Sequence, residues 1–227
     1  MDIPVSPQLV DGCWFSLPPG YHDIDPNSLE HLRVQLEQEL PLVHDDPSVA
    51  MQRLRETGAL LRLLDELYEA GTMHAAFGLH TGLEGELCVS VLTLSDVATG
   101  APNPTLAAAR CSIDLATGEF GVVVDRRQID HSSGRPAALT ARMLPQFPAH
   151  LLAATGIETR APDVFQARLA VARPYGSRVV VIDLTTCATN MATEYTDILL
   201  GIGQTVSFVD PASEPALPPS RLLEVLL

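Results

Sequence analysis

Three residue types found together in hydrolase active sites, Asp130, His131 and Ser132, are consecutive in a polar stretch of the chain. A catalytic triad needs its acid, imidazole and nucleophile brought together from separate segments, with the nucleophile on a constrained turn. Three adjacent residues do not provide that geometry. The sequence therefore predicts no serine-hydrolase site here, and we expect a protein that is not an enzyme.

Metal-ligating residue types occur in two places. The stretch Val-His-Asp-Asp at 43–46 lies between two expected helices, but Asp46 precedes Pro47 and is expected to cap the second helix. Adjacent residues also do not easily converge on one ion. His74 and His80 share one face of an expected strand, yet six residues of strand separate them by about 20 Å. We expect no metal ion and no cofactor.

The motif Gly-Ile-Gly at 201–203 could be mistaken for a phosphate-binding loop. Such a loop requires a strand, then a glycine-rich turn, then a helix N-terminus. Here the glycines end an expected helix over residues 193–203 and lead into an expected short strand. The order is reversed, so the sequence predicts no nucleotide binding.

The densest positive cluster of the chain, within residues 125–136, contains Arg126, Arg127 and Arg135. These three are the candidate anion-binding residues, as a grip for an anion or a carboxylate. The alternative is a solvated strand end and loop, and we favour that alternative.

An expected hairpin in the C-terminal third organises the rest of the chain. Apolar residues alternate over 164–173, and both faces are apolar over 178–186, as in a central strand. Closing the turn over residues 174–177 fixes the register. The expected pairs are Val171 with Val180, Leu169 with Ile182, Ala167 with Leu184, and Arg168 with Asp183. We interpret the Arg168–Asp183 pair as a half-exposed structural ion pair, contributing about 0.2–1 kcal/mol.

The remaining elements follow from start signals, periodicity and turns. Asp25-Pro26 and Asp46-Pro47 predict helices over 26–40 and 47–70, with Gly71 at the second C-terminus. We expect a strand at 13–17 with Trp14 in the core, and a loop at 21–24. Further strands are expected at 74–80, 119–124 and 138–144, and 86–94 is expected to form a hairpin with 107–115. The helix over 193–203 should turn Tyr195, Ile198, Leu199 and Ile202 inward, and 145–162 should be irregular with a short helical piece at 149–155.

Composition excludes several partners. The formal net charge is −14, and all 14 basic residues are Arg. This charge disfavours nucleic acids, whose phosphates require neutralising cations, and anionic membranes. No apolar run approaches the length of a membrane span and no signal peptide is evident, so we expect a cytoplasmic protein without membrane insertion. The four distant cysteines are expected to be reduced thiols, with Cys88 and Cys111 on opposite sheet faces.

Two stretches resemble the PsbP-like family. The first is Cys-Trp-Phe-Ser-Leu-Pro-Pro-Gly at 13–20, and the second is 164–209, which contains VVVIDLTT and EYTDILLGIGQTVSF. The resemblance implies an α+β fold in which an antiparallel sheet is flanked by helices as an α/β/α sandwich. It implies a single domain over residues 1–210. The residues themselves add a Pro-rich spacer and apolar C-terminal tail at 211–227, which is extra to the family pattern. Characterised members of the family are mainly binding or assembly factors without catalysis.

The functional expectation is a non-catalytic protein–protein interaction or assembly module of a high-GC bacterium. The alternative is an immunity-type inhibitor or secretion chaperone that covers a basic partner, and an enzyme is the third hypothesis. A neighbouring toxin or secretion gene would favour the alternative. The apolar tail docks either on its own domain or on another chain, and homodimerisation is expected through a sheet edge or the tail. The candidate partner-binding residues in the tail are Leu222, Leu223, Val225, Leu226 and Leu227.

Overall fold

The computed structural model of the chain describes residues 8–24, 34, 66–69, 71–82, 85, 87–116, 121–144 and 163–210. The helices expected over 26–40 and 47–70 lie almost entirely outside the described residues, as do 145–162 and the tail 211–227. Residues 66–69 are helical, and Gly71 after them has a φ of 98°. A positive φ is the conformation that glycine supplies at a helix C-terminus, as the sequence predicts.

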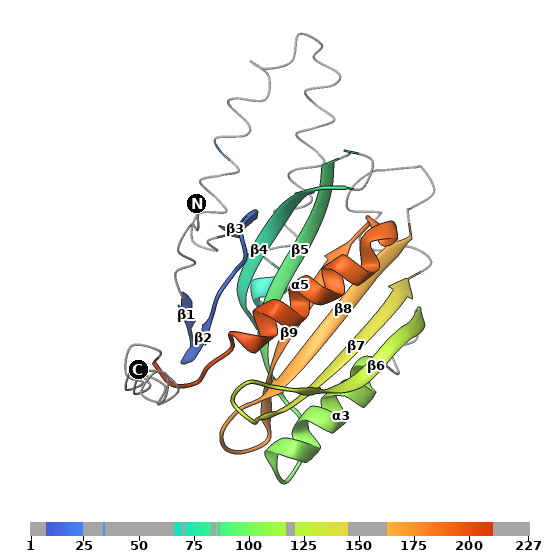
Figure 1. Cartoon of the computed structure of the whole chain (residues 1–227). Coiled ribbons are helices and arrows are strands. Elements are labelled where there is room, and N and C mark those ends of the chain that lie inside the picture. Colours follow the sequence, from blue (N-terminus) through green and yellow to red (C-terminus); the bar gives the residue numbers. More distant parts are fainter. Residues whose placement is uncertain are drawn as a thin grey trace, which may run out of the picture.

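One sheet organises the described part of the chain. Its seven strands all pair antiparallel, in the order β3-β4-β5-β9-β8-β7-β6 (Figure 1). The strands are β3 (Tyr21–Ile24), β4 (Thr72–Thr81), β5 (Leu87–Ala98), β6 (Val122–Asp130), β7 (Pro136–Leu144), β8 (Val164–Ala172) and β9 (Arg178–Thr186). β3 and β6 therefore form the two edges of this sheet.

The hairpin of β8 and β9 has the predicted register. Leu169 lies opposite Ile182 and Arg168 lies opposite Asp183, with the turn over 174–177 between the strands. β9 is the fourth of the seven strands, and most of its residues on both faces are buried. Its continuous apolar pattern is typical of a strand covered on both sides.

Helices cover both faces of the sheet, so the predicted α+β class with an α/β/α arrangement is confirmed for the described residues (Figure 1). Helix α5 (Ala192–Gln204) packs on β8 and β9 and buries Tyr195, Leu199 and Ile202 in the larger core. Helix α3 (Pro104–Ala116) lies on the opposite face, against β7, β8 and β9. The core beneath α3 is built of small residues, mainly alanine and valine.

The prediction that residues 107–115 form a strand was wrong, because they belong to α3. Asn103 caps this helix, since its Oδ1 accepts a hydrogen bond from the Leu106 N–H at 2.9 Å. Pro104 follows as the first helical residue, where its missing N–H costs nothing. The buried residues Ala107, Ala108, Cys111 and Ser112 have helical spacing. The predicted hairpin between 86–94 and 107–115 therefore does not exist, and the opposite-face argument for Cys88 and Cys111 fails, although all four cysteines are free thiols.

Three further expectations need correction. Residues 21–24 are not a loop but edge strand β3, which pairs with β4. The strand expected at 119–124 continues to Asp130 as β6, so Arg126 and Arg127 lie within a strand and not at its end. Trp14 belongs to β2 (Cys13–Phe15), which pairs with β1 (Gln8–Val10), and it is half-buried, not in the core. Alternate residues of a strand face opposite ways, and here Cys13 and Phe15 take the core side.

Candidate functional site

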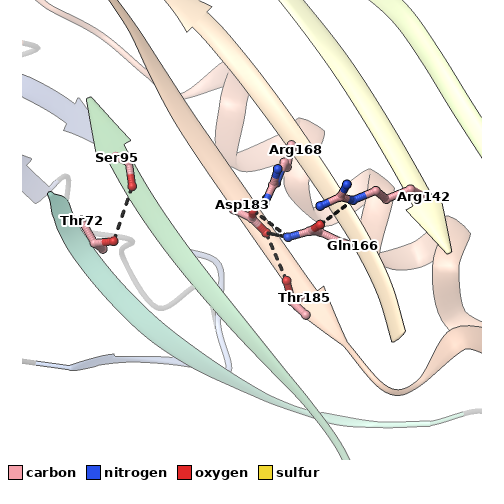
Figure 2. Close-up of polar contacts among 7 residues, drawn as sticks. All are labelled: Thr72, Ser95, Arg142, Gln166, Arg168, Asp183 and Thr185. Atoms are coloured by element: carbon pink, nitrogen blue, oxygen red, sulfur yellow. Dashed lines mark hydrogen bonds and ion pairs between the residues drawn. The ribbon is translucent and has the colours of Figure 1, made fainter. Parts of the chain in front are cut away.

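The α3 face of the sheet carries a polar network across three strands. Strand register sets Arg142 of β7 beside Gln166 of β8, and Arg168 of β8 beside Asp183 of β9 (Figure 2). Gln166 Nε2 donates to both carboxylate oxygens of Asp183, at 3.0 and 2.8 Å. Arg168 Nε donates to Asp183 Oδ2, Thr185 Oγ1 donates to Oδ1 at 3.1 Å, and Arg142 Nε donates to Gln166 Oε1 at 2.7 Å. One carboxylate thus ties three side chains of the central strands together.

This network is better shielded than the sequence indicates. The side chains of Arg168 and Asp183 are only 24% and 18% exposed. The sequence predicts a half-exposed pair, so this expectation was wrong. Burial lowers the pKa of Arg142, and the nearby charge of Arg168 lowers it further, while Asp183 raises it. The Asp183 carboxylate accepts hydrogen bonds from three side chains. A carboxylate engaged in this way is a structural anchor that joins neighbouring strands.

Thr72 and Ser95, also drawn in Figure 2, are a separate contact between β4 and β5. Their hydroxyl oxygens are 3.5 Å apart. This pair is a weak cross-strand contact at the limit of hydrogen-bond distance. It does not extend the network of Asp183.

The consecutive residues Asp130, His131 and Ser132 form a structural latch in place of a catalytic triad. His131 Nδ1 accepts a hydrogen bond from the Ser133 N–H, so Nε2 carries the proton and donates to the Gly203 carbonyl at 2.9 Å. Ser132 Oγ donates to the backbone carbonyl of Gln204 at 2.9 Å. Burial lowers the pKa of His131. The hydrogen bond to Gly203 raises this pKa, but its effect is smaller than that of burial. The latch joins the β6–β7 turn to the end of α5.

His74 and His80 share the α5 face of β4, as predicted, and pack against aromatic rings. His74 contacts the edge of Phe15, and His80 contacts Tyr21 and Tyr195, with ring centroids 5.1 to 5.6 Å apart. Burial lowers the pKa of both histidines. Among the described residues, no group of three or more His, Cys, Asp or Glu side chains is arranged to hold a metal ion. The two rings act as core-facing aromatic groups here.

A polar cluster beside His80 was not found by sequence reasoning. Tyr21 Oη and Ser90 Oγ lie 3.0 Å apart, and Ser90 and Tyr195 are fully buried. Burial raises the pKa of Tyr21 to about 12, which keeps its hydroxyl protonated at neutral pH. The Ser90 hydroxyl is paired with a phenol and closed off from solvent, so this arrangement offers no nucleophile. Tyr21 stood in an expected loop, so no sequence signal connected it with Ser90.

The three predicted anion-binding arginines do not gather at one point. Arg126 and Arg127 are neighbours in β6, and their pairing with Thr140 and Leu139 places them on opposite faces of the sheet. Arg127 Nε lies 3.3 Å from Asp125 Oδ2. The guanidinium of Arg135 lies over the ring of Phe208, 5.4 Å from its centroid. These positions do not bring all three guanidinium groups to one anion, and the predicted anion binding in this stretch stays a prediction.

A groove of about 340 Å³ runs between α3 and β6. Its helix side is formed by Thr105, Ala109, Ser112 and Ile113, and its strand side includes Arg126 and Gln128. It lies where α3, which packs mainly on β7, β8 and β9, leaves the edge strand uncovered. The groove is lined mostly by small and apolar residues, with Arg126 and Arg127 on its strand side, and such a lining suits a protein side chain.

The β6 edge beside the groove is long and begins with three exposed apolar residues. β6 has nine residues, and β7 is its single neighbour among the described strands. The side chains of Val122, Val123 and Val124 are 68%, 40% and 53% exposed. Unpaired backbone groups along such an edge are a template for another strand, which natural proteins usually block with short strands, Lys or Pro. The tail residues 222–227 lie outside the described residues, so their predicted role stays a prediction.

Comparison with known proteins yields remote structural likenesses. No known protein family and no curated protein matches this sequence. PA94 from Pseudomonas aeruginosa, a protein of unknown function, is 14% identical with a TM-score of 0.39, over 62% of this chain and 84% of that chain. LpqN, involved in cell envelope biogenesis of Mycobacterium tuberculosis, is 11% identical with a TM-score of 0.45, over 90% and 85%. The Saccharomyces cerevisiae Ran-binding protein Mog1p is 10% identical with a TM-score of 0.45, over 92% and 98%.

The last two structures have PsbP-like folds, the type that the sequence resembles. With TM-scores below 0.5, these likenesses are too loose to assign a family or a function to this chain. No helix in the described part of the chain is long and apolar enough to cross a membrane.

Proposed function

We propose that this chain is a non-catalytic, cytoplasmic protein-binding module that assembles with its partner along the β6 edge. The observation that carries the proposal is the nine-residue edge strand with Val122, Val123 and Val124 exposed beside a groove. Strand addition at an open edge supplies main-chain hydrogen bonds, and an adjoining groove supplies pockets for alternate side chains. Two of the titratable groups that could have done chemistry, Asp183 and His131, are engaged in holding strands and turns together.

The test is a lysine scan of exposed valines. A lysine at an edge strand keeps other strands from pairing with it, so Val122→Lys should release the chain from its native complex. Val209→Lys is the matched control, because Val209 is also about half exposed but lies outside the sheet. The apparent mass of the tagged chain is measured by size exclusion in extracts of the native cell. A Val122→Lys chain that stays in the complex would contradict the proposal.

The alternative function is that of a cover for a basic partner, such as a toxin or a secreted substrate. The net charge of −14 supports it, because opposite charge steers and selects partners. The alternative predicts a complex that dissociates as salt is raised and is insensitive to Val122→Lys. Edge pairing predicts instead a complex that Val122→Lys releases.

A further inference from the structure

The charge order along β6 is self-complementary. Asp125 and Arg127 lie opposite Ala141 and Leu139 of β7, so both side chains point to the α5 face, while Arg126 between them points to the α3 face. In two antiparallel strands related by a two-fold axis, directly opposed residues share a face. Asp125 can therefore oppose Arg127 of a second copy, and then Arg127 opposes Asp125 of that copy.

Other two-fold registers of the same edge are less favourable, and the one centred on Gln128, which opposes Arg126 to Asp130, pairs only residues 126–130 of each β6 strand. A pairing centred on Asp125 places two carboxylates face to face, and one centred on Arg127 places two guanidinium groups face to face on the same side. The register centred on Arg126 gives two attractive pairs on the α5 face and one pair of like charges on the α3 face. Each Arg126 lines its own groove on that face, so the two guanidinium groups can turn away from each other. A bulge at Val124 interrupts the ladder toward β7 but leaves residues 125–130 regular.

The apolar groups near the edge fit a second copy as well. Leu106 and Ile113 are about half exposed and lie seven residues apart, on the same side of α3. Ile113 lines the groove beside β6. Two β6 strands joined by a two-fold axis perpendicular to the sheet place both α3 helices on one face of a continuous sheet, on either side of the axis. Val122–Val124 then run along the end of β6 of the other copy, where Ile129 lies.

We infer that the chain forms a homodimer in which the two β6 strands pair antiparallel about Arg126, with Asp125 of each copy opposite Arg127 of the other. This inference rests on the proposed function, because it names a second copy of this chain as the partner of the same edge. Closed two-fold pairing of this kind satisfies the backbone groups of both edges at once.

A charge-swap experiment tests the register. The full chain should sediment at twice its mass of 24.4 kDa. Asp125→Arg and Arg127→Asp each place like charges opposite each other and should weaken dimerisation about tenfold or more. An equimolar mixture of the two variants restores opposite charges between positions 125 and 127 and should recover the dimer, which misfolded chains could not do. Asp197→Arg, on the exposed side of α5, changes the charge as Asp125→Arg does and should leave the dimer intact.

The outcomes separate the inference from the proposed function. A wild-type chain that sediments as a monomer at all concentrations overturns the homodimer, and so does a dimer that neither variant weakens. In either case the proposed function stands if Val122→Lys still releases the chain from a native complex. If Val122→Lys does not release the chain, the proposed function fails together with the homodimer. A monomer whose β6 amides exchange slowly until residues 211–227 are removed would assign the edge to the chain's own tail and also overturn the homodimer.

Discussion

For Asp183, the strand register predicts the cross-strand partner correctly, but the sequence underestimates how much the side chain contributes to stability. The sequence correctly predicted Arg168 as its cross-strand partner. It did not reveal that Gln166 and Thr185 also donate to the carboxylate, because the register puts both on the face of Asp183 but does not fix their side-chain conformations. A carboxylate with several donors and little solvent is costly to remove, since each donor loses its acceptor.

Removing the Asp183 side chain should therefore destabilise the protein more than the sequence interpretation implied. Asp183→Ala should lower the free energy of unfolding by about 2–3 kcal/mol, because it leaves Arg168 and Gln166 without their shared acceptor. The matched control is Arg110→Ala, which removes an exposed i,i+4 ion pair with Asp114 and should cost at most about 0.5 kcal/mol. Urea unfolding measures both. A loss below about 1 kcal/mol for Asp183→Ala would mean that the network contributes no more than a surface ion pair.

The histidines predict the direction of the pH dependence. Burial lowers the pKa of His131 below 6.5 in the folded protein, and the pKa values of His74 and His80 shift in the same direction. The unfolded chain then binds protons at a pH where the folded chain does not. The free energy of unfolding should consequently fall as the pH drops below about 6.5 toward the folded pKa values.

The variant His131→Gln isolates one contribution to this slope, because its amide can donate to the Gly203 carbonyl without titrating. Between about pH 7 and pH 5, its free energy of unfolding should depend less steeply on pH than that of the wild type. One histidine accounts for at most about 1.4 kcal/mol per pH unit. Equal slopes for the two proteins would show that His131 titrates as it does in the unfolded chain.

At the scale of elements, the sequence predicts a helix well where large apolar residues recur at helical spacing. It distinguishes helix from strand poorly where the segment consists of small residues. The helix over 193–203 and its inward residues were predicted, because its apolar residues recur at helical spacing and no strand register competes. Residues 107–115 were assigned to a strand although Asn103-Pro104 is a helix start. The three consecutive alanines at 107–109 favour a helix by propensity, so both they and the cap carried information that the strand assignment missed.

Two glycines of α5 give opposite predictions for the same substitution. A Cβ at Gly203 would overlap Leu169 Cδ2 of β8, so Gly203→Ala should destabilise the protein by about 1–3 kcal/mol. A Cβ at Gly201 meets no described atom within 4 Å. Gly201→Ala should therefore stabilise by up to about 1 kcal/mol through helix propensity alone. Thermal unfolding of both variants measures the difference, and a Gly203→Ala variant at least as stable as the wild type would mean that α5 does not pack closely on β8.

At the scale of the whole molecule, the sequence predicted the sheet class and the central hairpin but not the strand order. Consecutive β5 and β6 lie far apart in the sheet, because β9, β8 and β7 come between them. The candidate site depends on that order, since β6 is an edge only because β7 alone pairs with it among the described strands. Arg126 and Arg127 were selected for their charge, whereas the exposed valines just before them carry the binding proposal. Local pattern cannot say which strand is left without a neighbour.

The most direct test of the account is a photo-crosslinking residue placed at Val123 in the native cell. Val123 lies on the β6 edge, and Tyr175, in the exposed turn between β8 and β9, is the control position. The account predicts a discrete protein adduct from position 123 that is absent from position 175 and is lost when Val122→Lys is added. Equal adducts from both positions, or none from position 123, would contradict the claim that the β6 edge binds protein.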